Sequence, residues 1–126
     1  MTKLLMIGAC GAAGAVCRYA TGLICLRLLG GGFAFGTLTV NVVGCFLLGL
    51  AMQLMQSETI HVSNTMHLAI TAGFLGALTT FSTFGYETLH HAMQGEWGLA
   101  GLNIAANLAL GLLAVGGGIG AARLIG

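Results

Sequence analysis

The stretch GFLGALTTFSTF, which runs from Gly73 to Phe84, decides how this chain folds. Its glycines at 73 and 76 weaken a helix, and four of the five positions from 79 to 83 carry hydroxyl groups that compete for helical hydrogen bonds. Apolar residues continue on both sides, from about Met66 to about Met93. We therefore predict one long apolar helix that is broken near its middle. Such a break is tolerated at membrane depth only where the freed backbone groups find a cavity, an ion or a partner.

The composition of the whole chain predicts that this helix lies in a membrane. Of the 126 residues, 57% are hydrophobic and 6% are charged, and the mean hydropathy is +0.98. A soluble domain normally has about a quarter of its residues charged. A spanning helix needs about 20 mostly apolar residues, so four of them with short loops fill the chain. No extramembrane domain is left for nucleic acid, and a net charge of +1 gives no basic surface for it.

Apolar runs and the segments between them divide the sequence into four helices. The segment 56–64 is the longest hydrophilic one and is expected to be a loop. The predicted fold class is an all-α membrane protein with four transmembrane helices per subunit, the third of them broken. We expect a single membrane domain, residues 1–126, with helices at roughly 4–29, 33–55, 66–93 and 97–124.

Lysine and arginine are few, and they are divided almost evenly between the two sides of the membrane. Lys3 and Arg123 lie on one side and Arg27 on the other, with Arg18 further inside the first helix. An excess of such residues in cytoplasmic loops sets orientation, and a difference of about one residue does not fix it. We expect the chain to insert both ways and to assemble as an antiparallel pair. Glycines at helical spacing support close packing of helices, either within one chain or between two.

Polar side chains within the expected helices form two pairs. Thr37 and Asn41 are four residues apart on the second helix and share a face. Asn103 and Asn107 have the same spacing on the fourth helix. Each pair can hold helices together by hydrogen bonds or line a polar track through the membrane, and two such faces in one small bundle favour the track. Neither face carries a carboxylate, so the track does not select a cation by charge.

Two phenylalanines follow the weakened part of the third helix. Phe81 and Phe84 are three residues apart and project the same way. Such a pair is usually part of a packed core. The edges of aromatic rings carry partial positive charge, so edges turned toward a path would suit a small anion. The residues alone leave both interpretations open.

The segment Gly73 to Phe84, above all Gly76 and the run TTFSTF at 79–84, resembles the signature of the Fluc (CrcB) family of fluoride channels. The run GTLTVNVVG at 36–44 resembles the second-helix motif of that family, and Gly14 to Arg18 resembles its first-helix motif. The similarity covers the whole chain in length, helix number and scarcity of charge. It implies a channel, not an enzyme, that exports fluoride passively across the inner (plasma) membrane as a multi-pass protein and lowers cytoplasmic fluoride toxicity.

The resemblance also implies an assembly, a dual-topology antiparallel homodimer with two pores and a sodium ion at its centre. The sodium would bind backbone carbonyls of Gly76 and Thr79. In the fourth helix some relatives have a tyrosine and serines where Asn103, Asn107 and Gly111 align, so the role of Asn103 stays open. The implied pore residues are the amide donor Asn41, the ring-edge pair Phe81 and Phe84, the polar-track residues Thr37, Ser82 and Thr83, and Asn107.

Two rare charges inside the expected helices, Arg18 and Glu87, leave alternatives open. Arg18 can lie near a pore mouth or pair with Glu87. The main alternative function is a small dual-topology exporter that exchanges drugs for protons, which needs a titratable carboxylate in its binding site. The first helix has none, and Glu87 lies late in the third. A protein that only assembles through its glycine faces would need neither the two polar faces nor a broken helix, so the residues favour the channel.

Overall fold

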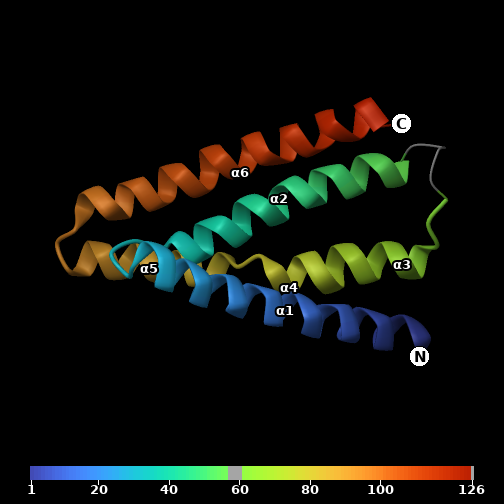
Figure 1. Ribbon diagram of the computed structural model, residues 1–126, viewed down its shortest axis with the longest axis horizontal. Helices are drawn as coiled ribbons and strands as arrows, with labels where there is room; N and C mark the ends of the chain where they lie inside the picture. Colours follow the sequence, from blue (N-terminus) through green and yellow to red (C-terminus); the bar gives the residue numbers. More distant parts are fainter. Residues whose placement is uncertain (57–60, 126) are drawn as a thin grey trace.

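The computed structural model describes residues 1–56 and 61–125, and these form helices joined by short connections (Figure 1). Residues 57–60, which are part of the expected loop at 56–64, and residue 126 lie outside the described residues. Gln56 still belongs to the second helix and Asn64 begins the next one. The elements in chain order are α1 Thr2–Leu29, α2 Phe35–Gln56, α3 Asn64–Leu68, the π-helix η1 Ala69–Leu75, α4 Gly76–Leu78, α5 Phe81–Met93 and α6 Trp97–Ile125.

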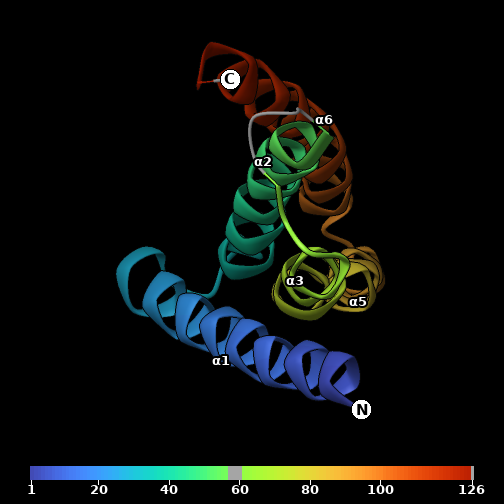
Figure 2. The ribbon, with the colours of Figure 1, turned by 90° about the vertical axis from the view of Figure 1, so that its right-hand side faces the viewer.

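The helices run up and down between two ends of the molecule. Both chain termini lie at one end, and the α1–α2 and α5–α6 connections lie at the other (Figure 1). The most extensive pairing is that of α2 with α6, and α1 packs mainly against η1. Viewed from the end that carries the termini, α1 crosses beneath the third span while α2 and α6 lie together on its other side (Figure 2). The third span is therefore the layer between α1 and the α2–α6 pair.

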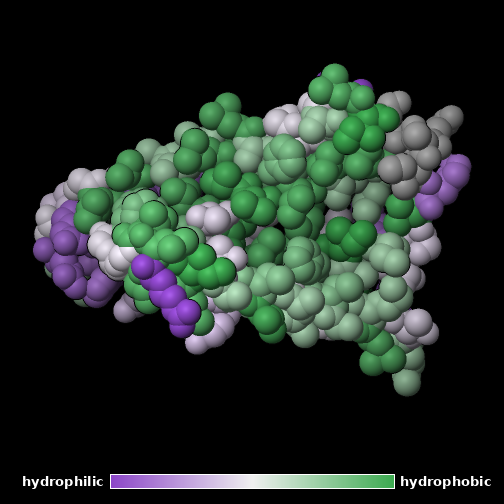
Figure 3. All heavy atoms as spheres, viewed as in Figure 1, coloured by the Kyte–Doolittle hydropathy of each residue, from purple (hydrophilic) through white to green (hydrophobic). Residues whose placement is uncertain are grey.

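Four helical segments of the described chain are long and apolar enough to cross a membrane: α1, α2, the composite span 64–93 and α6. The described residues contain no strand. The prediction of an all-α chain with four membrane helices is therefore confirmed. The surface is hydrophobic over most of its middle, and hydrophilic atoms gather mainly toward the two ends (Figure 3). Such a distribution suits a bundle surrounded by lipid tails, with its polar ends in the interfaces.

Glycines bring α2 and α6 together backbone to backbone. A Cβ atom added at Gly49 would overlap the carbonyl oxygen of Val115, and one added at Gly118 would overlap that of Phe46. The two glycines lie on opposite helices, so the close approach is reciprocal. Small residues let membrane helices gain van der Waals contact that larger side chains prevent. These two glycines therefore pack helices within one chain.

The third span changes backbone geometry twice. The first change is η1, where the hydrogen bonds widen to the π pattern over seven residues. The second lies between α4 and α5, where Thr79 (φ −81°, ψ 157°) and Thr80 (φ −150°, ψ 112°) are extended. Helical geometry resumes at Phe81. The Thr80 hydroxyl caps α5 by accepting a hydrogen bond from the Thr83 N–H at 3.3 Å.

The buried apolar core lies directly beside this break. Val40 of α2 packs with Leu75 and Leu78, which end η1 and α4, and all three side chains are buried. Partly buried Leu47, Ile70 and Phe74 surround them. Leucine and valine contacts thus fix the α4 side of the break against α2. Polar contacts, described below, fix the extended residues themselves.

Candidate functional site

Asn41, on the second turn of α2, supplies the hydrogen bonds that the extended residue Thr80 lacks. The Asn41 Oδ1 atom accepts from the Thr80 N–H at 2.8 Å, and the Asn41 Nδ2 atom donates to the Thr80 carbonyl at 3.3 Å. One side-chain amide therefore pairs with both backbone groups of Thr80, as a neighbouring strand would. Unpaired backbone groups at membrane depth cost several kcal/mol each, about 4 or more in an apolar medium. Asn41 is thus part of what makes the break stable.

The second amide hydrogen of Asn41 is directed at α6. The Asn41 Nδ2 atom donates to the Asn107 Oδ1 atom at 2.9 Å. We expect Asn41 to be an amide donor, and in the structure both hydrogens of its side-chain amide already have protein acceptors. The bond to Thr80, at 3.3 Å, is the longer of the two and hence the weaker. It is the one that an entering hydrogen-bond acceptor could replace.

Four of the residues expected to line a pore surround one cavity of about 310 Å³ beside the break. Phe81 is 80% exposed and Phe84 is half-buried, and their ring centroids are 5.5 Å apart with the planes tilted by 55°. The two rings are therefore not stacked face to face. The expected site residues that line this cavity are Asn41, Gly76, Thr79, Phe81, Phe84 and Asn107.

A second cavity, of about 590 Å³, lies on the other side of the break, toward the α1–α2 and α5–α6 connections. Thr37, Thr83 and Arg18 line it together with Glu87. Thr80 lines both cavities. Ser82 lines neither of the two, but its hydroxyl lies 3.4 Å from that of Thr80. The extended residue is thus the point where the two cavities meet.

The rare charges share the larger cavity without pairing. The Thr37 hydroxyl donates to Glu87 Oε1 at 2.9 Å, and Glu87 Oε2 has no hydrogen-bond partner among the described residues. Arg18 lines the same cavity, yet the ion pair found in the described part of the chain joins His91 and Glu96 instead, at 2.6 Å. Arg18 therefore lies on the wall of this cavity with no carboxylate partner among the described residues.

The carbonyls of Gly76 and Thr79 lose their helical donors at the break. In a continuous helix the Thr80 N–H would donate to Gly76, but it donates to Asn41 Oδ1 instead. Likewise the Thr83 N–H would donate to Thr79, but it donates to the Thr80 hydroxyl. Gly76 is also exposed in the isolated subunit. Both carbonyl oxygens suit a cation that prefers neutral oxygen ligands.

Thr80 is the site residue that sequence reasoning missed. It was part of the motif at 79–84, but no separate role was given to it. Its side chain is 7% exposed, and its hydroxyl donates to the Thr83 hydroxyl at 2.9 Å. Threonine is one of the preferred N-cap residues, and its place directly before the second half of the apolar span could have identified it.

The chain is similar in sequence to a known family of proteins. Residues 5–119 match the model of a family described as CrcB-like protein, Camphor Resistance (CrcB). The chain is 49% identical over 115 residues to a protein of Dehalococcoides mccartyi strain BAV1, with 91% of this chain and 88% of that one covered. It is 46% identical over 123 residues to a protein of Geobacter sulfurreducens, with 98% of both chains covered. Each relative is named Fluoride-specific ion channel FluC.

Proposed function

The chain belongs to the CrcB family, and from that premise we propose that it is a fluoride channel. The family resemblance seen in the sequence is confirmed by the match over residues 5–119. The chain is a multi-pass protein of the inner membrane, and it catalyses no reaction. The structural observation that carries the proposal is the break at Thr80, where two cavities meet beside uncharged hydrogen-bond donors.

Neutral donors suit fluoride for a physical reason. Fluoride is small and strongly hydrated, so a pore has to replace its water with hydrogen bonds without holding the ion too tightly. Asparagine amides and threonine or serine hydroxyls donate without carrying a fixed charge. On this proposal Asn41 exchanges its long bond to the Thr80 carbonyl for the passing anion. Its shorter bond to Asn107 Oδ1 keeps the amide in place meanwhile.

The remaining pore residues act on either side of that amide. The ring edges of Phe81 and Phe84 face the anion in the smaller cavity and carry partial positive charge. Thr37 and Thr83 contribute hydroxyl groups to the larger cavity, and Ser82 extends the hydroxyl cluster of Thr80. Arg18 attracts the anion at the mouth of the larger cavity, where it has no carboxylate partner among the described residues.

The working assembly, on this proposal, is an antiparallel homodimer with a sodium ion at its centre. A two-fold axis beside Gly76 and Thr79 would bring two carbonyl oxygens from each chain together, which gives four neutral ligands. The loss of helical donors at both carbonyls supports this assignment. A dimer structure determined in sodium salts should show a cation at this point. Water or side chains alone there would refute it.

The exporter alternative has no support in the comparisons, because the relatives carry the name of a fluoride channel. An exporter of that kind needs a titratable carboxylate in its binding site, and α1 carries none. We therefore keep the channel as the single proposed function.

Fluoride efflux from liposomes tests the proposal. The purified chain is reconstituted into liposomes loaded with potassium fluoride, and efflux is followed with a fluoride electrode after valinomycin is added to balance charge. Rapid efflux that needs no proton gradient or nucleotide is expected, with protein-free liposomes and chloride-loaded liposomes as controls. Fluoride efflux no faster than in protein-free liposomes would overturn the proposal. Exchange of a cationic drug for protons would point to the exporter instead.

A further inference from the structure

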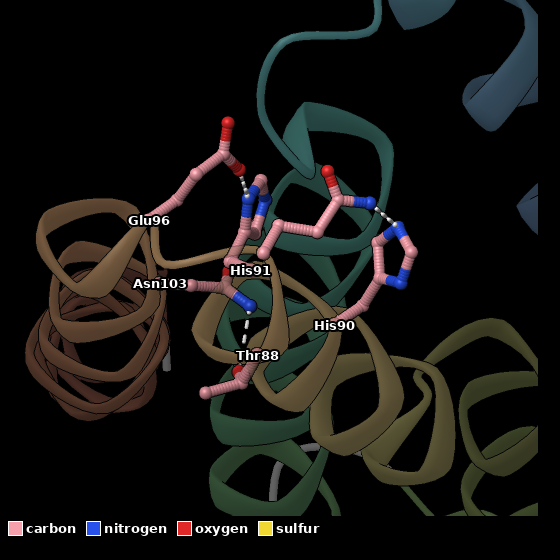
Figure 4. Close-up of polar contacts among 6 residues, drawn as sticks. Thr88, His90, His91, Glu96 and Asn103 are labelled. Carbon is pink, nitrogen blue, oxygen red and sulfur yellow. Dashed lines mark hydrogen bonds and ion pairs between the residues drawn. The ribbon is translucent and has the colours of Figure 1, made fainter.

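Asn103 of α6 is the most deeply buried polar side chain near the break, with 0% exposure. Its Nδ2 atom donates to the hydroxyl oxygen of Thr88 on α5 at 2.9 Å, and Figure 4 shows the two side chains pointing toward each other. The Thr88 hydroxyl donates in turn to the Phe84 carbonyl at 2.8 Å. Asn103 thus reaches the backbone of a residue whose ring lines the smaller cavity.

The oxygen of the Asn103 side-chain amide faces Asn107, which in turn contacts Asn41 of α2. Its Oδ1 atom accepts from Asn107 Nδ2 at 3.0 Å, and the Asn103 carbonyl accepts from the same nitrogen at 3.0 Å. Asn107 Oδ1 then accepts from Asn41. A single run of hydrogen bonds therefore links Asn41, Asn107, Asn103 and Thr88 to the carbonyl of Phe84.

All the donors in this run of hydrogen bonds point in one direction, from Asn41 toward Phe84. The Phe84 carbonyl, which ends the run, explains why. A backbone carbonyl can only accept, so the Thr88 hydroxyl has to donate to Phe84 and offer its lone pair to Asn103. Asn103 must then turn its nitrogen toward Thr88 and its oxygen toward Asn107. Asn107 consequently presents its oxygen, not its nitrogen, to Asn41. Hydrogen bonds aligned in this way strengthen one another.

We propose that Asn103 is a positioning residue that, together with Thr88, fixes the direction of the Asn107 and Asn41 amides and ties them to Phe84. Asn103 does not line the smaller cavity, so it acts through Asn107 without touching the ion. Without the Asn103 side chain, only the Asn103 backbone carbonyl holds the Asn107 nitrogen. The Asn107 amide then turns more easily so that its nitrogen faces Asn41, where two donors would oppose each other. Asn41 would then lose its alignment with Thr80. This inference rests on the proposed fluoride channel.

Isosteric variants of Thr88 and Asn103 test the inference. Thr88→Val and Asn103→Leu remove the links and should lower the rate of fluoride efflux by about tenfold or more. They should also raise the fluoride concentration that gives half-maximal efflux, whereas a mere loss of folded channels would lower the maximal rate alone. Thr88→Ser keeps the hydroxyl and should restore efflux to near the wild-type rate.

Thr21→Val is the matched control. The Thr21 hydroxyl also donates to the carbonyl four residues earlier, at 2.9 Å, but among the described residues no asparagine donates a hydrogen bond to it. It should conduct fluoride like the wild type. If Thr88→Val and Asn103→Leu also conduct like the wild type, with unchanged half-maximal concentrations, the inference is overturned. Loss of efflux in Thr88→Ser as severe as in Thr88→Val would overturn it too.

If these variants do not elute as folded protein, hydrogen exchange of the asparagine side chains in the unmodified chain tests the inference instead. The chain has four asparagines, at 41, 64, 103 and 107, and 15N labelling of asparagine gives separate side-chain amide signals. Slow hydrogen exchange at Asn103 and Asn107, compared with exposed Asn64, supports the inference. Exchange at Asn103 as fast as at Asn64 overturns it. A wild-type chain that passes no fluoride would instead overturn the proposed function and leave these signals readable.

Discussion

At the scale of single residues, Asn41 connects the fold with the proposed transport. Its side chain forms hydrogen bonds with the extended residue Thr80 and also lines the smaller cavity. Asn41→Asp would place a second oxygen, usually ionised, against the Thr80 carbonyl and Asn107 Oδ1. A negative charge about 4 Å from fluoride costs about 4 kcal/mol at an effective dielectric constant of about 20. Since about 1.4 kcal/mol is tenfold in rate, we expect efflux to fall by about 100-fold or more.

The comparison variant is Asn41→Ser, which keeps a neutral donor and should retain more of the efflux than Asn41→Asp does. Size-exclusion elution of both variants checks that the protein remains assembled. If Asn41→Asp conducts at the wild-type rate, Asn41 only packs α2 against its neighbours and the pore runs elsewhere.

The two phenylalanines differ in exposure, which separates transport from stability. Phe81→Ile changes a side chain that is 80% exposed in the subunit, so the folding of the subunit should not change. Phe84→Ile keeps most of the apolar volume at a half-buried position. Each change removes a ring edge worth about 1 kcal/mol, so we expect fluoride efflux to fall by about fivefold in each variant. Unchanged efflux in both would return the pair to a packing role.

Some of the residues of the candidate site could be predicted from the sequence. Residue type and spacing singled out Asn41, Phe81, Phe84 and Asn107, and the family resemblance gave them their pore roles. The structure brings all four to one cavity. The partners of Asn41 lie 39 and 66 residues away along the chain, and no local pattern encodes such separations. For the same reason the direction of the asparagine run could not be read from the sequence.

At the scale of elements, the α2–α6 pair depends on glycines that touch the opposite backbone. Gly118→Ala would place a methyl group against the Phe46 carbonyl and 2.7 Å from the Leu50 nitrogen. Overpacking of this kind costs about 1 to 3 kcal/mol, so the variant should unfold at a lower temperature in detergent. The matched control is Gly120→Ala, whose added Cβ would meet nothing within 4 Å. It should unfold at the same temperature or higher, because alanine favours a helix by about 1 kcal/mol over glycine. Equal melting temperatures for the two variants would contradict the packing role of Gly118.

The four apolar helices could be predicted because each needs a long hydrophobic run, and such runs are visible in any sequence. The π-helix Ala69–Leu75 was not predicted. It differs from an α-helix by one residue in its hydrogen-bond spacing, and its apolar sequence carries no mark of that difference. Tertiary packing decides it, since Gly73 there faces the backbone of Ile7 on α1.

At the scale of the whole molecule, the ends of the bundle carry nearly equal positive charge. Lys3 and Arg123 belong to the end with both termini, and Arg27 to the opposite end. We expect a cysteine introduced at Ser63, in a chain whose native cysteines are replaced, to be labelled about equally from either side of the membrane. Ser63 is exposed and is the N-cap residue of α3, so the label is accessible. Labelling from one side alone would exclude dual insertion.

The run from Asn41 to α6 also sets an order of events on the ribosome. The hydrogen-bond acceptor on Asn107 is synthesised 66 residues after Asn41. At about 5 to 20 residues per second, the nascent α2 waits roughly 3 to 13 seconds for it. For the first 39 residues of that interval the amide, which lies in a membrane-spanning helix, lacks the Thr80 carbonyl as well. The last helix to leave the translocon therefore completes the break in the third, and a ribosome that stalls before Trp97 releases a chain whose central amide still lacks its α6 partner.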